Sequence, residues 1–156
     1  MSEQAYNAAM NMTGMLGAFF NTVAEEIGRE QALASLSKSL ENLGAMSGKM
    51  TKEQMGIEKL DVSTVGSIMK GMGETYGLTS EVKEGPNTVL VKNYMCPFYD
   101  GLRAAGFDHE AIEAFCRHGP ATMVESFFGQ IDPTIKYQLK KFRSSAEDFC
   151  EEEIAL

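Results

Sequence analysis

The residues of this 156-residue chain with the most distinctive chemistry are its three cysteines. Two of them, Cys96 and Cys116, lie near the ends of the stretch NYMCPFYDGLRAAGFDHEAIEAFCRHG, and Cys150 lies almost at the C-terminus. Three thiolates from separate elements could hold Zn²⁺, with His118 or solvent as a fourth ligand, or an iron–sulfur cluster with one open iron. The chain has no CxxC pair, so three ordinary buried thiols are an equally simple interpretation.

Each thiol has a different predicted setting. Cys96 follows a predicted strand and precedes a helix, where outward-pointing backbone N–H groups lower the pKa of a thiol. Cys116 lies on the apolar face of a helix, and Cys150 lies in the last strand. On a continuous helix His118 would be rotated about 200° from Cys116, so the two could share a metal only if Pro120 breaks the helix.

Side chains near Cys96 could orient a small organic substrate. The guanidinium of Arg103 can fork to a carboxylate, although it could also lie on a solvated helix face. Tyr94 and Tyr99 are further candidate ligand-binding residues. Cys96 could also attack a substrate directly, but no histidine has a secure place as its base.

The chain is rich in methionine, with eleven in 156 residues. Met12, Met15, Met69, Met72 and Met123 fall on the predicted inner faces of helices. Flexible thioethers form adaptable apolar walls around a ligand, but they also fill ordinary cores, so both interpretations stay open.

Composition limits the class of protein. The chain has 22 acidic and 14 basic residues, a formal net charge of -8 that suits nucleic-acid binding poorly. Its length and its 44% hydrophobic content predict a single domain over 1–156. The N-terminus has no Lys or Arg before its apolar part, and no apolar run approaches the roughly 20 residues of a membrane span. We therefore expect a cytoplasmic protein without membrane or nucleic-acid partners, in which three cysteines do not form a disulfide framework.

The N-terminal half, 1–77, is predicted to be helical. Apolar residues at spacings of three and four predict helices over 4–27, 30–43 and 62–76. Gly44 is expected to end the second helix in the left-handed conformation, with a loop over 44–56. The buried stripe of the first helix is expected to comprise Ala5, Ala8, Met12, Met15, Phe19, Val23 and Ile27.

The pattern changes to strands in the second half, 78–156. Alternation predicts strands on both sides of EGPN, the second ending at Cys96-Pro97. A short helix, a helix capped by Asp108 and a break at HGP follow. The last two strands, TIKYQLKKF and FCEEEIAL, carry complementary charges and are predicted neighbours. The result is an α+β fold, in which a helical half precedes a small, mainly antiparallel sheet with helices packed on one face.

The motifs CPFYDGL, FC and DFCEEEIAL together resemble the family of L-2-amino-thiazoline-4-carboxylic acid hydrolase-like proteins. More distantly they resemble the hydrocarbon-binding domains of the 4-vinyl reductase type. The resemblance covers about 78–156, with a looser match at EEIGREQAL. It implies a metal or thiol site at Cys96, Cys116 and Cys150, near a pocket for a small organic molecule. The chain departs from the family at SSAEDFC, which lacks the usual glycine of that turn.

Two classes of function follow from these observations. The first is a hydrolase acting on the C–N bond of a cyclic amidine or thiazoline, using a thiolate or a water activated by Zn²⁺. The second is a non-catalytic binding or sensory module for an apolar small molecule, or an iron–sulfur accessory protein, using the same cysteines. The long N-terminal helix could also form the interface of a homodimer.

Overall fold

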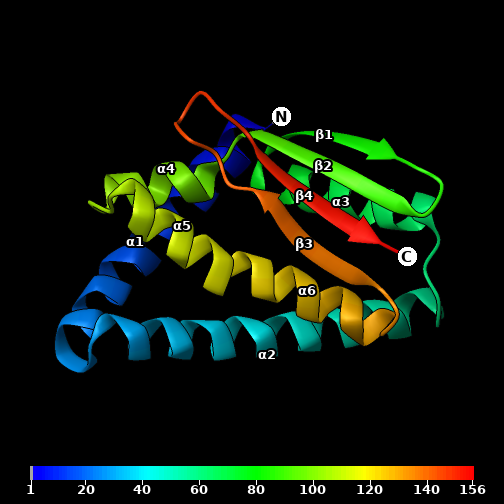
Figure 1. Ribbon diagram of the computed structural model, residues 1–156, viewed down its shortest axis with the longest axis horizontal. Helices are drawn as coiled ribbons and strands as arrows, with labels where there is room; N and C mark the ends of the chain where they lie inside the picture. The colour runs from blue at the N-terminus through cyan, green and yellow to red at the C-terminus, as the bar shows by residue number, and fades with distance from the viewer. Residues whose placement is uncertain (1) are drawn as a thin grey trace.

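The structure is a computed structural model and describes residues 2–156. Figure 1 shows a sheet that packs against helices. The elements are α1 (Glu3–Ile27), α2 (Arg29–Met55), α3 (Val62–Tyr76), β1 (Thr79–Glu84), β2 (Thr88–Met95), α4 (Pro97–Ala104), α5 (His109–His118), α6 (Pro120–Ile131), β3 (Lys136–Lys141) and β4 (Cys150–Ala155). The α+β class and the order of its helical and sheet-containing halves are as predicted.

The sheet is antiparallel throughout, with the strand order β1-β2-β4-β3. In the pairing of the two central strands, Asn93 lies opposite Cys150 and Val89 lies opposite Ile154. The charges predicted to join the last two strands form ion pairs, Lys140 to Glu153 at 3.4 Å and Lys141 to Asp148 at 2.7 Å. The end of β2, near Cys96, therefore lies beside the start of β4, where Cys150 is found.

The prediction that α2 ends at Gly44 is wrong. The helix continues to Met55 and ends at Gly56, which has the left-handed conformation at φ 63°. In Figure 1, α2 and α6 run side by side for much of their length. A Cβ atom at Gly44 would collide with the backbone of Met123, and one at Gly48 would collide with that of Phe127. Glycine is kept inside this helix because it lets two backbones approach closely, which offsets its poor helix propensity.

The predicted buried face of α1 is also wrong. The buried residues are Ala9, Thr13, Gly17 and Phe20, whereas Met15 and Phe19 are 75% and 67% exposed. A Cβ at Gly17 would lie 3.0 Å from Leu102 of α4, so small residues of α1 pack closely on α4, while Phe20 is buried in the core. Among the described residues, no helix is both long enough and apolar enough to cross a membrane.

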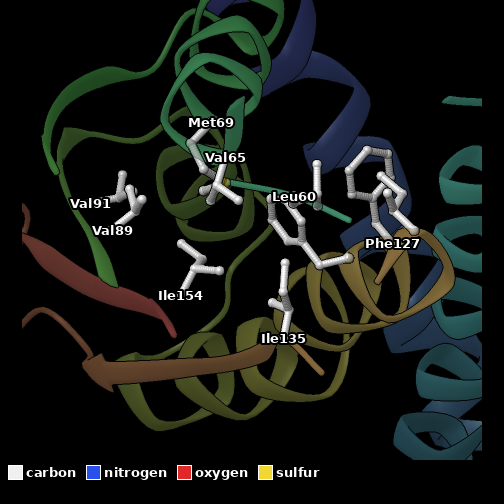
Figure 2. Close-up of a cluster of buried hydrophobic side chains, with 10 residues drawn as sticks. Leu60, Val65, Met69, Val89, Val91, Phe127, Ile135 and Ile154 are labelled. Carbon is white, nitrogen blue, oxygen red and sulfur yellow. The ribbon is translucent and has the colours of Figure 1, made fainter. Parts of the chain in front are cut away.

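The apolar core has two parts. Figure 2 shows one part, in which Val89, Val91 and Ile154 of the sheet face Val65 and Met69 of α3. The other part joins α1, α2, α4 and α5 through Phe20, Leu36, Leu102, Ile112 and Phe115. Residues of both parts line a cavity between the sheet and the helices.

Candidate ligand cavity

A cavity of about 440 Å³ lies between the inner face of the sheet and the helices. Its walls are mostly apolar and include four methionines, Met12, Met69, Met72 and Met123, together with leucine, valine and aromatic side chains. The polar groups are few: chiefly Ser80, Asn93, Tyr137 and Glu152, and the three thiols. An apolar pocket with a small number of placed polar groups is typical of a small-molecule site.

The cavity has an open end between α1 and α2. Met12, Leu16 and Leu43 line it and are also 54%, 38% and 42% exposed. At the other end of the cavity, the buried residues along β2 are first the apolar Val89 and Val91 and then the polar Asn93. The cavity therefore runs from an apolar mouth to a polar end against the sheet.

All three cysteines line this cavity, although they come from three separate elements. Cys96 precedes α4, Cys116 lies on α5, and Cys150 begins β4. Burial raises the pKa of the Cys96 thiol to about 11, and it raises that of Cys116 well above its usual value. A hydrogen bond from the Tyr99 backbone and the charge of Arg143 lower the pKa of Cys96, but burial has the larger effect. The expectation of a lowered pKa at Cys96 is therefore wrong.

The arrangement of these thiols does not fit a metal centre. Among residues 2–156, no three histidine, cysteine or acidic side chains are placed to hold a metal ion together. His118 ends α5 at an exposed position and is not part of the cavity wall. The predicted helix break is present at Gly119, but it does not bring His118 to the cavity.

Glu152 supplies a carboxyl group at the polar end of the cavity. The side-chain amide of Asn93 donates a hydrogen bond of 2.7 Å to Glu152 Oε1, and Asn93 accepts one from Ser80. Tyr137 is a second hydrogen-bonding partner of the Glu152 side chain. Burial raises the pKa of Glu152 to about 7, although both partners act to lower it. The carboxyl group can therefore exchange protons near neutral pH.

Sequence reasoning did not single out Glu152, although a signal was present. The alternation of FCEEEIAL places Glu152 on the same face as Cys150 and Ile154, which makes it an acidic residue at an inward position. A charged group at such a position is rare without a partner or a function. That pattern was sufficient to mark Glu152 as a candidate.

Arg143 is a second residue that sequence reasoning missed. It is 1% exposed, and its terminal nitrogens donate to the backbone oxygens of Asn93, Tyr94 and Ala146 at 2.9, 2.8 and 3.2 Å. Its guanidinium lies beside the Cys150 thiol, and its Nε is buried without a hydrogen-bond acceptor. Arg143 therefore fixes the corner where β2 leaves the sheet and places a positive charge behind the thiols.

The other predicted site residues are divided between the cavity and the surface. Tyr99 lines the cavity together with the predicted methionines Met69, Met72 and Met123. Tyr94 is 40% exposed, and its hydroxyl donates to Glu81 at 3.1 Å. Arg103 is exposed and lines a separate, shallower pocket with His109, on the outer side of Tyr99. Neither Tyr94 nor Arg103 belongs to the cavity wall.

These features define a class of protein: an α+β fold whose apolar cavity carries an acid and three thiols at its sheet end. Residues 8–151 match the sequence model of the L-2-amino-thiazoline-4-carboxylic acid hydrolase family, and the chain belongs to this family. The predicted resemblance is thus confirmed and extends over most of the chain, while the relation to 4-vinyl reductase domains stays a prediction. None of the curated proteins compared with the chain matches it.

Proposed function

We propose that this protein hydrolyses a C–N bond of a cyclic amidine, such as a 2-aminothiazoline, with Glu152 as the acid–base group. The observation that carries the proposal is the buried Glu152 carboxyl group that faces the cavity between two hydrogen-bonding partners. The family name, which denotes a hydrolase of an amino-thiazoline, supports the same reaction class.

Glu152 is suited to bind an amidine. A protonated amidine carries two N–H groups that point the same way, as a guanidinium does, and such a fork forms two parallel hydrogen bonds to a carboxylate. Asn93 and Tyr137 hold the carboxyl group in one orientation. A substrate bound in this way places its amidine carbon next to the group that exchanges protons.

The proposed reaction consumes one water molecule. The Glu152 carboxylate takes a proton from water while the oxygen adds to the amidinium carbon, and the π electrons of the C=N bond move to the ring nitrogen. Glu152 returns this proton to the ring nitrogen as the C–N bond breaks with its electron pair on nitrogen. The hydroxyl proton of the adduct leaves through Glu152 to the freed amine nitrogen as the carbonyl forms, so the single ring-opened product carries a carbonyl group and a protonated amine.

The thiols have a secondary part in this proposal. Direct attack by Cys96 would need its thiolate, which burial disfavours. Cys96, Cys116 and Cys150 therefore shape the wall beside the reacting carbon. A zinc or iron–sulfur centre would require the three thiols to move together and ionise.

A second candidate function is a non-catalytic binding module for an apolar small molecule. The methionine-lined walls of the cavity favour it, because Met69, Met72 and Met123 can adapt to a ligand that has no reactive group. In that case Glu152 serves only to orient the ligand.

Turnover of cyclic amidines separates the two functions. The purified protein is incubated with 2-aminothiazolines, and the ring-opened product is measured by mass spectrometry. We expect Glu152→Gln to lower kcat by about 100-fold or more, as for loss of a general acid–base group. Glu153→Gln is the matched control, because Glu153 is the next residue and pairs with Lys140. Equal turnover by Glu152→Gln and the wild type overturns the proposal, and saturable binding without turnover favours the binding module.

A further inference from the structure

The charge of the cavity wall restricts what can bind there. Among the described residues that line the cavity there is no lysine, arginine or histidine, and Glu152 is the one acidic side chain. Arg143 lies behind the Cys150 thiol and is not part of the wall. Its terminal nitrogens donate to backbone oxygens, and its Nε is buried without an acceptor. The side chains of the wall itself therefore offer a ligand a partner for positive charge and none for negative charge.

This charge distribution disagrees with the compound that gives the family its name. That compound carries a carboxylate close to the ring, and a ring held at Glu152 would bring this carboxylate into the apolar part of the cavity. A buried carboxylate without a cationic partner is strongly disfavoured, and a second carboxylate nearby adds repulsion. The wall of this cavity supplies no group that could offset either effect.

The size and shape of the cavity indicate a ligand larger than a single five-membered ring. Its volume of about 440 Å³ lies in the range of pockets that bury ligands of drug size, well above the need of one five-membered ring. The space between Glu152 and the mouth is bounded by apolar side chains, among them Met72, Met123, Leu16 and Leu43. A ligand with its polar head at Glu152 would fill this space with an apolar body.

We infer that the substrate of this protein is a lipophilic amidine base, with a cationic head at Glu152, an extended apolar substituent directed to the mouth between α1 and α2, and no carboxylate. This inference rests on the proposed function for the position of the amidine head. It adds the class of substrate, which differs from that of the family name.

Ligands that share one alkyl tail and differ in the charge of the polar head group test which charge the cavity accepts. Binding of decanamidine, decanol and decanoate is measured by calorimetry below their micelle concentrations, with acetamidine as the head without a tail. We expect decanamidine to bind about tenfold or more tightly than decanol, because its head pairs with Glu152. We expect decanoate to bind more weakly than decanol by a similar factor, about tenfold, because its charge finds no partner. Equal or tighter binding of decanoate overturns the inference.

Variants at the polar end test the role of Glu152. In Glu152→Gln the preference for decanamidine over decanol should fall to about threefold or less, because a neutral amide cannot pair with the cation, while decanol still binds. Glu153→Gln should keep the full preference. An unchanged preference in Glu152→Gln overturns the inference. Retained decanol binding also shows that the variant is folded.

Variants at the mouth test the position of the tail. Leu16→Asn should weaken decanamidine and decanol alike, by about tenfold, and leave acetamidine unchanged, because the substitution removes apolar contact with the tail only. Met15→Asn is the matched control, since Met15 is 75% exposed and does not line the cavity. Equal effects of the two substitutions on the binding of tailed ligands overturn the proposed position of the tail at the mouth of the cavity.

Turnover of tailed and carboxylated aminothiazolines separates this inference from the hydrolytic proposal. If tailed amidines bind through Glu152 but tailed thiazolines are not turned over, the hydrolytic proposal falls and the ligand class stands. If the carboxylated thiazoline is hydrolysed faster than a tailed thiazoline without a carboxylate, the hydrolytic proposal stands and the substrate class is overturned.

Discussion

The side-chain amide of Asn93 donates a hydrogen bond of 2.7 Å to the carboxyl group of Glu152, from one central strand of the sheet to the other. Asn93 in turn accepts a hydrogen bond from Ser80 of β1. This chain of polar groups crosses three strands and ends in the cavity, where Glu152 has its other partner, Tyr137 of β3. The sheet therefore orients one acid toward the ligand space.

Removing the Asn93 amide should destabilise the protein and raise the pKa of Glu152 further, because this hydrogen bond lowers that pKa. We expect Asn93→Ala to lower the free energy of unfolding by about 1–3 kcal/mol, since it leaves a buried acceptor unpaired. Urea denaturation measures the first effect, and NMR titration of the Glu152 carboxyl carbon measures the second. A lower pKa in Asn93→Ala would contradict the assigned hydrogen bond.

The raised pKa of Glu152 also makes folding depend on pH. In the folded state the pKa is about 7, against 4.5 for an unperturbed glutamate, so between these values the folded protein binds more protons than the unfolded one. The contribution of Glu152 is fully present below about pH 4.5 and is lost as pH rises through about 7. The loss is on the order of 3 kcal/mol, from about 1.4 kcal/mol per pKa unit.

Urea denaturation at pH 5 and pH 8 tests this dependence. Glu152→Gln cannot ionise, so its free energy of unfolding should fall less than that of the wild type between these pH values. Glu153→Gln is the control and should keep the wild-type dependence. Identical pH dependence in Glu152→Gln and the wild type would show that the carboxyl group is not desolvated as described.

The buried thiols should react slowly with alkylating agents. With a pKa of about 11 in place of 9.0, Cys96 has roughly a hundredth of the thiolate of an unperturbed cysteine. Iodoacetamide labelling at pH 8, followed by mass spectrometry, should show Cys96 reacting about 100-fold more slowly in folded protein than in urea. Labelling at the rate of a free thiol would contradict the predicted burial.

Metal analysis tests the arrangement of the three cysteines. Protein purified without oxygen should contain no stoichiometric zinc or iron, and a chelator should leave its Tm unchanged, because no three ligands converge among residues 2–156. Stoichiometric zinc in colourless protein, or iron with broad visible absorption, would mean that Cys96, Cys116 and Cys150 rearrange around a metal. Loss of the metal in Cys116→Ser would then identify the site.

The close approach of α2 and α6 can be tested at a glycine. Gly44→Ala should destabilise the protein by about 1–3 kcal/mol or more, because its Cβ meets the backbone of Met123. Gly71→Ala is the matched control within a helix, since a Cβ at Gly71 meets nothing within 4 Å. That substitution should stabilise the protein by about 0.5–1 kcal/mol through helix propensity. Thermal unfolding of both variants distinguishes packing from propensity.

The sequence by itself determined the elements whose signals are local. Asp61 caps α3 by accepting a hydrogen bond from the Thr64 N–H, and Gly77 ends that helix with φ 69°. The side chains of β3 alternate between exposed and half-buried positions. Caps, turns and strand alternation depend on neighbouring residues, so they can be inferred without knowledge of the fold. The three cysteines could be selected as candidates for the same reason, because their residue type alone marks them.

The tertiary structure decided what each helix presents to its neighbours. Gly44 is typical of a helix end by local rules, but contact with α6 keeps it within α2. Both Met15 and Phe20 lie on apolar stripes of α1. Phe20 is the buried one because it lies on the side of α1 whose small residues pack against α4. Glu152 acquires its raised pKa from burial, which depends on contacts between residues far apart in the sequence. Close packing and desolvation are properties of the assembled core, so residue spacing cannot specify them.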